Sequence, residues 1–147
     1  MAKPRKPQHK VSEGSFRIIA GRWRGRRLQF PANAELRPTA DRVRETLFNW
    51  LQPYIAGSTV LDAFAGSGAL SLEALSRGAT AVTAWDKDKQ TANAIRQHGD
   101  ILGLTDSQQL TTLAIDTQNR LKKPSDTPFD IVLLDPPFRR NWWPDIF

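Results

Sequence analysis

The order of apolar and polar residues from residue 58 onward predicts four strands that alternate with helices. Four short apolar or β-branched runs each end in an aspartate: Asp62, Asp86, Asp116 and Asp135. Helices are expected between these runs at 69–78, 87–99 and 117–123, where the spacing is helical or a glycine or proline ends the segment. Strands separated by helices form right-handed crossovers and a parallel sheet with helices on both faces. The sequence therefore predicts an α/β fold in which the four aspartates share the carboxyl edge, where such sheets bind ligands.

Two further elements are predicted before the sheet. Residues 16–31 interleave apolar side chains with arginines and contain a glycine turn near Gly25, which indicates a short β-hairpin or ribbon. Residues 36–53 have the pattern of a helix with Thr39 as its N-cap and Pro53 as its stop. One apolar face is expected on this helix, made of Val43, Leu47, Trp50 and Leu51.

The composition narrows the class of protein. At 147 residues the chain fits one domain with a substantial core, and 39% hydrophobic and 24% charged residues fit a soluble globular protein. The longest apolar run falls far short of a membrane span, and no apolar segment follows the basic amino end as in a secretory signal. Cysteine is absent, and His9 and His98 have no ligand-like spacing around them. We therefore expect a cytoplasmic protein without a metal site.

The net charge of +6 is unevenly distributed along the chain. Residues 1–52 carry twelve Lys and Arg against four acids, whereas residues 53–147 carry nine against eleven. This division predicts a disordered basic tail at 1–15, an RNA-facing ribbon and helix at 16–53, and a ligand-binding body at 54–147. A solubilising tail is the alternative explanation of the charge alone.

Two groups of basic residues are the candidates for RNA contact. In the ribbon, guanidinium groups next to an indole can meet phosphates and also stack on bases. Arginines at the start of the helix are not favoured by the helix dipole, which suggests an anionic ligand there, although a plain solvated face is the alternative. The candidates are Arg22, Trp23, Arg24, Arg26, Arg27, Arg37, Arg42 and Arg44.

The stretch DAFAGSG, residues 62–68, carries the signal for a cofactor. Gly66 and Gly68 would let the backbone approach a ligand closely, but the third position of a dinucleotide-binding loop is Ser71 here, which argues against a pyrophosphate cofactor. A carboxylate at Asp62 would repel phosphate yet could meet the ammonium and sulfonium groups of S-adenosylmethionine. Asp86 is placed to accept from ribose hydroxyls, and Asp116 could accept from an adenine amino group. Each aspartate alone could equally be a cap.

The stretch DPPF, residues 135–138, is the most specific chemical motif. Pro136 and Pro137 keep the backbone extended and leave carbonyls that no local amide can claim. The Asp135 carboxylate and the Pro136 carbonyl would suit a planar exocyclic amine, and Phe138 offers a ring for the attached base to stack on. A strand followed by a proline turn is the alternative.

Together these residues resemble the class I S-adenosylmethionine-dependent methyltransferases, which have a Rossmann-like sheet and modify exocyclic amines with an Asp/Asn-Pro-Pro-Phe/Tyr motif. Four segments, RIIAGRWRGRRL, LRPTADRVRETLFNWL, DAFAGSGALSLEALSRGA and LLDPPFRR, resemble in order and spacing the bacterial family that methylates the N2 amine of one guanine in 16S ribosomal RNA. The resemblance covers residues 16–140.

The resemblance implies functions for particular residues. Cofactor contacts are expected from Asp62, Ala65, Gly66, Gly68, Asp86 and Asp116. The target amine is expected at Asp135, Pro136, Pro137 and Phe138, where alignment of the amine with the methyl donor would supply most of the acceleration. The expected partner is 16S rRNA or a small ribosomal subunit assembly particle.

Members of that family continue beyond the DPPF strand with a helix and three further strands. This sequence instead ends at NWWPDIF, so the sheet is expected to be truncated on that side, either as a fragment or as a short form completed by association. Two other functions stay open: an amine methyltransferase that acts on another nucleic acid or protein, and an RNA-binding or cofactor-binding protein without turnover.

Overall fold

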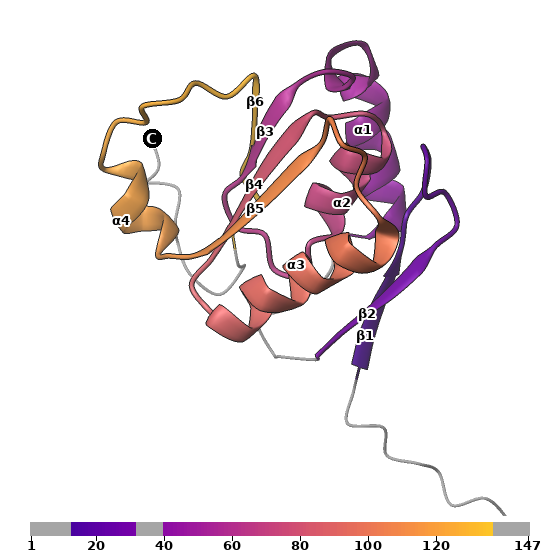
Figure 1. The fold of residues 1–147 in the computed structure, drawn as a ribbon, viewed down its shortest axis with the longest axis horizontal. Coiled ribbons are helices and arrows are strands. Elements are labelled where there is room, and N and C mark those ends of the chain that lie inside the picture. Colours follow the sequence, from indigo (N-terminus) through magenta and orange to yellow (C-terminus); the bar gives the residue numbers. More distant parts are fainter. Residues whose placement is uncertain (1–12, 32–39, 137–147) are drawn as a thin grey trace, which may run out of the picture.

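The computed structural model describes residues 13–31 and 40–136 and contains a four-stranded parallel sheet (Figure 1). Its strands lie in the order β5-β4-β3-β6. The strands are β3 (Thr59–Asp62), β4 (Ala81–Asp86), β5 (Gln109–Ala114) and β6 (Ile131–Leu133). The chain moves outward from β3 through β4 to β5 and then returns to pair β6 with the free side of β3, so the strand order reverses between β3 and β6. Crevices at such a reversal are where sheets of this type bind ligands.

Four helices accompany the strands in the part of the chain that the structure describes. They are α1 (Asp41–Ile55), α2 (Ala69–Ser76), α3 (Lys89–Leu102) and α4 (Thr117–Leu121). Phe48 of α1, Leu72 of α2 and Leu102 of α3 belong to the same hydrophobic cluster as Val60 of β3. The next residue of that strand, Leu61, points to the opposite face and belongs to a second, smaller cluster. The prediction of an α/β fold with helices on both faces is confirmed, and Figure 1 shows α4 on the side away from α1 and α2.

A two-stranded antiparallel ribbon precedes the sheet. It pairs β1 (Glu13–Arg17) with β2 (Arg27–Pro31), and Gly25 lies in the connecting turn with a φ of +83°. The predicted hairpin and its turn are therefore confirmed. The prediction of disorder is wrong for residues 13–15, because backbone pairing and close packing hold them: a Cβ added at Gly14 would lie 2.3 Å from the ring of Phe30. The remainder of the predicted tail, residues 1–12, lies outside the described residues.

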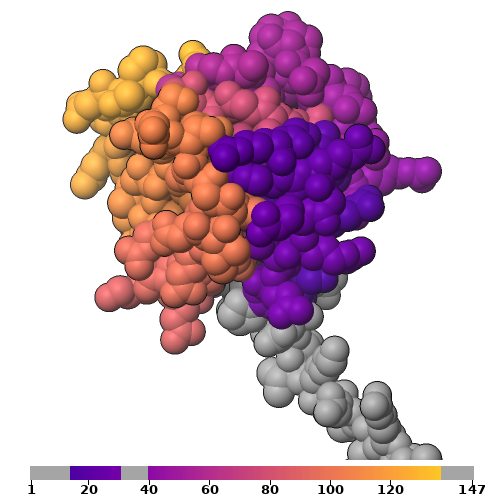
Figure 2. All heavy atoms as spheres, turned by 45° about the vertical axis from the view of Figure 1, so that its right-hand side comes forward, coloured from indigo at the N-terminus to yellow at the C-terminus, as the bar shows by residue number. Residues whose placement is uncertain are grey.

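The ribbon and the sheet share one hydrophobic core. The buried ribbon side chains are Phe16, Ile18, Trp23, Leu28 and Phe30, and all belong to the cluster that contains Val60, Val82 and Leu133 of the sheet. Figure 2 shows the ribbon, in indigo, packed directly against the rest of the protein. The predicted segments 16–53 and 54–147 thus meet through a common apolar interior.

Helix α1 buries a different face from the one that its sequence suggests. Val43 and Trp50 were expected inside but are 56% and 74% exposed, whereas the buried residues are Arg44, Phe48 and Ile55. Arg44 is inside because its charge meets acids on α1 and α2. The helix also continues two residues past Pro53, and it begins after Ala40; the predicted cap Thr39 lies outside the described residues. Among the described helices, none is long and apolar enough to cross a membrane.

Candidate cofactor and substrate site

Four aspartates lie along one edge of the sheet, and their order in space differs from their order in the chain. In register, Asp62 at the end of β3 lies beside Ala84 of β4 on one side and Leu133 of β6 on the other. Asp86 ends β4, Asp116 follows β5 by two residues, and Asp135 follows β6 by two residues. The order across the edge is therefore Asp116, Asp86, Asp62 and Asp135, which puts Asp62 between Asp86 and Asp135.

The Asp62 carboxylate is buried and could accept a further hydrogen bond from a ligand. It is fully buried, and the hydroxyl of Ser71 donates to its Oδ2 at 2.7 Å, while its Oδ1 has no hydrogen-bond partner among the residues that the structure describes. Burial raises the pKa of Asp62 to about 7; the nearby charges of Asp135 and Asp86 add to this rise, and the Ser71 hydrogen bond opposes it. A buried acceptor without a partner costs free energy that a ligand's ammonium group could recover. The Asp62 carboxylate thus fits the predicted contact with S-adenosylmethionine.

The loop that follows Asp62 has the backbone shape that the sequence predicts. Gly66 and Gly68 have φ values of +54° and +84°, a region that favours glycine. A Cβ at Gly68 would lie 2.9 Å from Ile95 of α3, so the second glycine also permits close packing. Ala65 is buried and its amide donates to the Trp85 carbonyl at 2.9 Å, which anchors the loop to β4. These contacts hold the loop at the start of α2, directly beside Asp62.

Asp86 connects this loop to the next strand. Its Oδ2 accepts from the Gly66 amide at 3.1 Å and its Oδ1 accepts from the Asp88 amide at 2.9 Å. Burial raises the pKa of Asp86. Because each carboxylate oxygen has two acceptor sites, both oxygens could still accept a ribose hydroxyl.

Asp116 lies at the outer end of the row. It is exposed, and its side chain accepts from the Gln118 amide at 2.9 Å, so it caps the start of α4. The neighbouring Thr117, which the sequence analysis missed, is buried, and its hydroxyl donates to the carbonyl of Ala63 in the cofactor loop. No local signal marks Thr117, because the contact joins residues far apart in the chain.

On the other side of Asp62 the chain leaves β6 toward the DPPF motif. Asp135 is exposed and Pro136 is half-buried, while Pro137 and Phe138 lie outside the described residues. Asp62 pairs in register with Leu133 of β6, two residues before Asp135, so the two aspartates end neighbouring strands. The target-amine motif is thus next to Asp62, the inner end of the predicted cofactor row.

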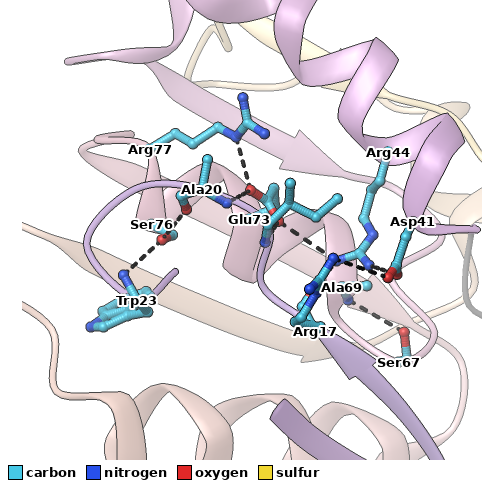
Figure 3. A network of polar contacts seen from close by, with 11 residues as sticks. Arg17, Ala20, Trp23, Asp41, Arg44, Ser67, Ala69, Glu73, Ser76 and Arg77 are labelled. Atoms are coloured by element: carbon cyan, nitrogen blue, oxygen red, sulfur yellow. Dashed lines mark hydrogen bonds and ion pairs between the residues drawn. The ribbon is translucent and has the colours of Figure 1, made fainter. Parts of the chain in front are cut away.

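The candidate RNA-facing residues separate into exposed and buried side chains. Exposed are Arg22, Arg24, Arg26, Arg27 and Arg42, and Arg37 lies outside the described residues. For Trp23 and Arg44 the prediction is wrong, because both are buried. The Trp23 side chain packs into the core cluster, and Arg44 pairs with Asp41 at 2.5 Å and Glu73 at 3.6 Å (Figure 3). In the described part of the chain, no three acids or histidines are grouped so as to hold a metal ion.

The strand order, the glycine loop and the row of aspartates define a class I methyltransferase fold. A solved structure of yhhF from Escherichia coli superposes with a TM-score of 0.76 at 41% identity, covering 90% of this chain and 70% of that one. SMU.776, solved with SAH, has a TM-score of 0.51 at 30% identity, over 65% of this chain and 25% of that one. The predicted fold class is confirmed.

The sequence comparisons identify the family. The model of the family described as Conserved hypothetical protein 95 matches residues 16–147. The protein named Ribosomal RNA small subunit methyltransferase D from Haemophilus influenzae is 49% identical over 138 residues, which are 93% of this chain and 71% of that protein. Its Escherichia coli K12 namesake is 46% identical over 137 residues, 93% of this chain and 67% of that one. The chain belongs to this family of S-adenosylmethionine-dependent methyltransferases, as the resemblance implied.

Proposed function

We propose that the chain transfers a methyl group from S-adenosylmethionine to the exocyclic N2 amine of a specific guanine in 16S ribosomal RNA. The relatives named Ribosomal RNA small subunit methyltransferase D support the kind of substrate. The observation that carries the proposal is the position of Asp62 between Asp86, on the predicted ribose side, and Asp135, on the predicted amine side.

The cofactor would lie along the row of aspartates. Asp62 would bind its ammonium group through the unpartnered Oδ1, Asp86 the ribose hydroxyls and Asp116 the adenine amino group. Gly66 and Gly68, with Ala65 between the strand and the helix, would shape the floor on which it rests. When bound, S-adenosylmethionine supplies a methyl group on a positively charged sulfur, which a nitrogen lone pair can attack.

The chain's own residues would then hold the amine in line with that methyl group. The Asp135 carboxylate and the Pro136 carbonyl would accept the two N2 hydrogens and so direct the lone pair, which is otherwise delocalised into the guanine ring. Pro137 would keep the turn stiff and Phe138 would stack on the base. The cofactor would supply the methyl carbon to the amine nitrogen and keep the electron pair of its carbon–sulfur bond, and Asp135 or water would take the proton that the amine loses.

RNA would be held by the exposed arginines of the ribbon, Arg22, Arg24, Arg26 and Arg27, by Arg42 of α1, and by Arg37. Clustered guanidinium groups release counterions from the phosphate backbone and give binding that weakens as salt rises. The buried Arg44 and Trp23 would support these residues from behind without touching RNA.

Methyl transfer to defined RNA tests the proposal. Small-subunit particles and deproteinised 16S rRNA that lack the modification are incubated with labelled S-adenosylmethionine, and the digested nucleosides are identified by mass spectrometry. Label in N2-methylguanosine is expected, and Asp135→Ala should keep cofactor affinity but lose turnover by roughly a hundredfold or more, since the amine loses an oriented acceptor. The matched control Asp106→Ala, which changes an exposed turn residue, should leave turnover unchanged.

Other results would reject the proposal in identifiable ways. Label in N6-methyladenosine would indicate a different amine substrate. Binding of S-adenosylmethionine without transfer to either substrate would indicate a cofactor-binding protein without turnover. Near-normal turnover of Asp135→Ala would remove Asp135 from the mechanism.

A further inference from the structure

Side chains of helix α2 bind the backbone of the loop that connects the two ribbon strands. The two carboxylate oxygens of Glu73 each accept one loop amide: Oε1 accepts from Ile19 at 2.8 Å and Oε2 accepts from Ala20 at 3.1 Å (Figure 3). Glu73 is fully buried, on the helix that begins directly after the cofactor loop. A buried carboxylate that accepts two adjacent amides fixes both the position and the direction of the loop.

Ser76, one turn further along α2, holds the next part of the loop. Its hydroxyl accepts from the Trp23 amide at 3.0 Å and donates to the Ala20 carbonyl at 2.7 Å, and its own carbonyl accepts from the Arg22 amide at 2.8 Å. Gly21 makes this approach possible: it has a φ of +88°, and an added Cβ would lie 2.0 Å from the Ser76 carbonyl oxygen. We use the term clasp for Glu73 and Ser76 together.

Two buried arginines balance the charge of the clasp. Arg77 Nε donates to Glu73 Oε2 at 2.8 Å, and Arg44 Nη1 lies 3.6 Å from Oε1 while it donates to the Arg17 carbonyl at 2.8 Å. Their guanidinium groups also lie 5.2 and 5.8 Å from the ring centres of Phe48 and Phe16. The clasp is therefore neutralised and packed, which makes the loop a fixed part of the body.

The loop in turn holds four exposed arginines in place. Within it, the Arg24 amide donates to the Gly21 carbonyl at 3.2 Å and the Arg26 amide donates to the Trp23 carbonyl at 3.0 Å. These turns and the clasp leave the side chains of Arg22, Arg24, Arg26 and Arg27 exposed. A loop that is already ordered loses less entropy when its cations meet phosphates.

The four arginines, which we call the arginine loop, lie at the other end of helix α2 from the cofactor loop. Helix α2 runs from Ala69, beside the cofactor loop, to Ser76, which contacts the arginine loop. Eight helical residues at about 1.5 Å each span about 12 Å. RNA bound at both places would have to extend over at least this length of the protein surface.

We infer that Glu73 and Ser76 are positioning residues that hold the arginine loop as an RNA anchor separate from the target-amine site. The inference rests on the proposed function and adds a second point of attachment to it. It requires a substrate long enough to reach from the target nucleotide to the anchor, so a short RNA around the target nucleotide would gain nothing from the clasp.

RNA binding in the absence of cofactor tests the inference, so a failure of methyl transfer would not obscure the result. The probes are fluorescently labelled 16S rRNA and a short fragment of a few nucleotides on either side of the target. Ser76→Ala removes two loop contacts, and Gly21→Ala pushes the loop away from α2. Each should weaken binding of 16S rRNA about three- to tenfold and leave binding of the fragment unchanged, while Ser15→Ala, an exposed ribbon serine, should change neither.

Further measurements separate positioning from general damage to the fold. Affinity for S-adenosylmethionine and the circular dichroism spectrum should be unchanged in Ser76→Ala and Gly21→Ala. When Arg22, Arg24 and Arg26 are replaced by Gln, binding of 16S rRNA should depend less on salt. The slope of log K against log salt concentration should become shallower by about 0.7 to 0.9 for each phosphate contact that is lost. Glu73→Gln should weaken binding more than Ser76→Ala; if it does not fold, Ser76→Ala and Gly21→Ala decide. Equal loss on the short fragment, or unchanged 16S rRNA binding in both variants, would overturn the inference.

Discussion

The contact between Ser71 and Asp62 should control how cofactor binding depends on pH. Ser71 donates to Asp62 Oδ2 at 2.7 Å inside the core, and both residues are fully buried. Burial already raises the pKa of Asp62 to about 7, and the Ser71 hydrogen bond lowers it. Ser71→Ala removes that hydrogen bond, so the pKa should rise further and the carboxylate should be protonated over more of the neutral range.

The size of the effect follows from the strength of such a hydrogen bond. A hydrogen bond to a charged group contributes about 1.5 to 3 kcal/mol, and one pKa unit corresponds to about 1.4 kcal/mol. The pKa of Asp62 in Ser71→Ala should therefore rise by about one to two units. At a pH below both pKa values, the fraction of ionised Asp62 falls about 10- to 100-fold, and the affinity for a ligand that needs the carboxylate falls by the same factor.

Calorimetric titration with S-adenosylhomocysteine between pH 5.5 and 7.5 measures the affinity as a function of pH. Over this range the amine of the ligand stays protonated, so changes in affinity report on the protein. Wild-type affinity should rise with pH and reach about half its maximum near pH 7, whereas that of Ser71→Ala should reach half its maximum about one to two pH units higher and still rise steeply at pH 7.5. Ser58→Ala removes another buried hydroxyl, which donates to the Ile55 carbonyl at 2.6 Å, and should keep the wild-type profile. If Ser71→Ala has the affinity and pH profile of the wild type, Asp62 does not bind the ligand in the way proposed.

Two other predictions concern stability. Asp62→Asn should stabilise the fold at pH 8. The pKa of the Asp62 carboxyl is near 3.8 in the unfolded chain and about 7 in the folded protein, so the wild type loses about 4 kcal/mol of folding stability as the pH rises between these values. The amide of the variant does not ionise and avoids this loss. Thermal melting should show the gain at pH 8 and none at pH 3.5, and equal melting temperatures at pH 8 would contradict the raised pKa. Arg44→Leu removes one buried partner of Glu73 and should lower the free energy of unfolding, measured by urea denaturation, by about 3 to 5 kcal/mol. The control Arg42→Ala, at an exposed position, should lower it by less than about 0.5 kcal/mol. A loss below about 1 kcal/mol would mean that the Arg44 pair contributes little.

Most of the sheet could be predicted because its signals are local. Each strand is a short apolar run, each crossover contains a helix, and the helix end at Gly78 is read from neighbouring residues. The carboxyl edge follows from the parallel arrangement, so the four aspartates could be assigned to one side of the sheet without coordinates.

The buried face of α1 could not be predicted because it depends on a distant partner. By sequence alone, Trp50 is a better core residue than Arg44. Arg44 is nevertheless inside, because Glu73, 29 residues later, brings a carboxylate to it through the fold of α2. The same distance hides the clasp, since nothing near Glu73 or Ser76 indicates that they accept the amides of residues 19, 20 and 23.

The sequence marks Ser71 as unusual but does not reveal its contact with Asp62. The sequence has serine where a dinucleotide-binding loop has glycine or alanine, and by itself this mismatch argues only against a pyrophosphate cofactor. The structure gives the mismatch a second meaning, because the Ser71 hydroxyl is the donor that holds Asp62. The acid at the end of the strand and the hydroxyl nine residues later thus form one hydrogen-bonded pair. A loop with only one of the two residues would not have this hydrogen bond.

The order of the aspartates in space explains why the reversal between β3 and β6 matters for chemistry. Along the chain, Asp116 separates Asp86 from Asp135, but across the edge Asp62 lies between these two. Neighbouring strands are about 4.8 Å apart, so a ligand extending from Asp116 to Asp62 crosses two strand spacings, about 10 Å, and the amine motif begins one spacing further on. A β6 on the outer side of β5 would leave Asp135 beside Asp116, three spacings from Asp62. The return of the chain to β3 is therefore what brings the carboxylate of the amine motif next to the one that would hold the charged end of the cofactor.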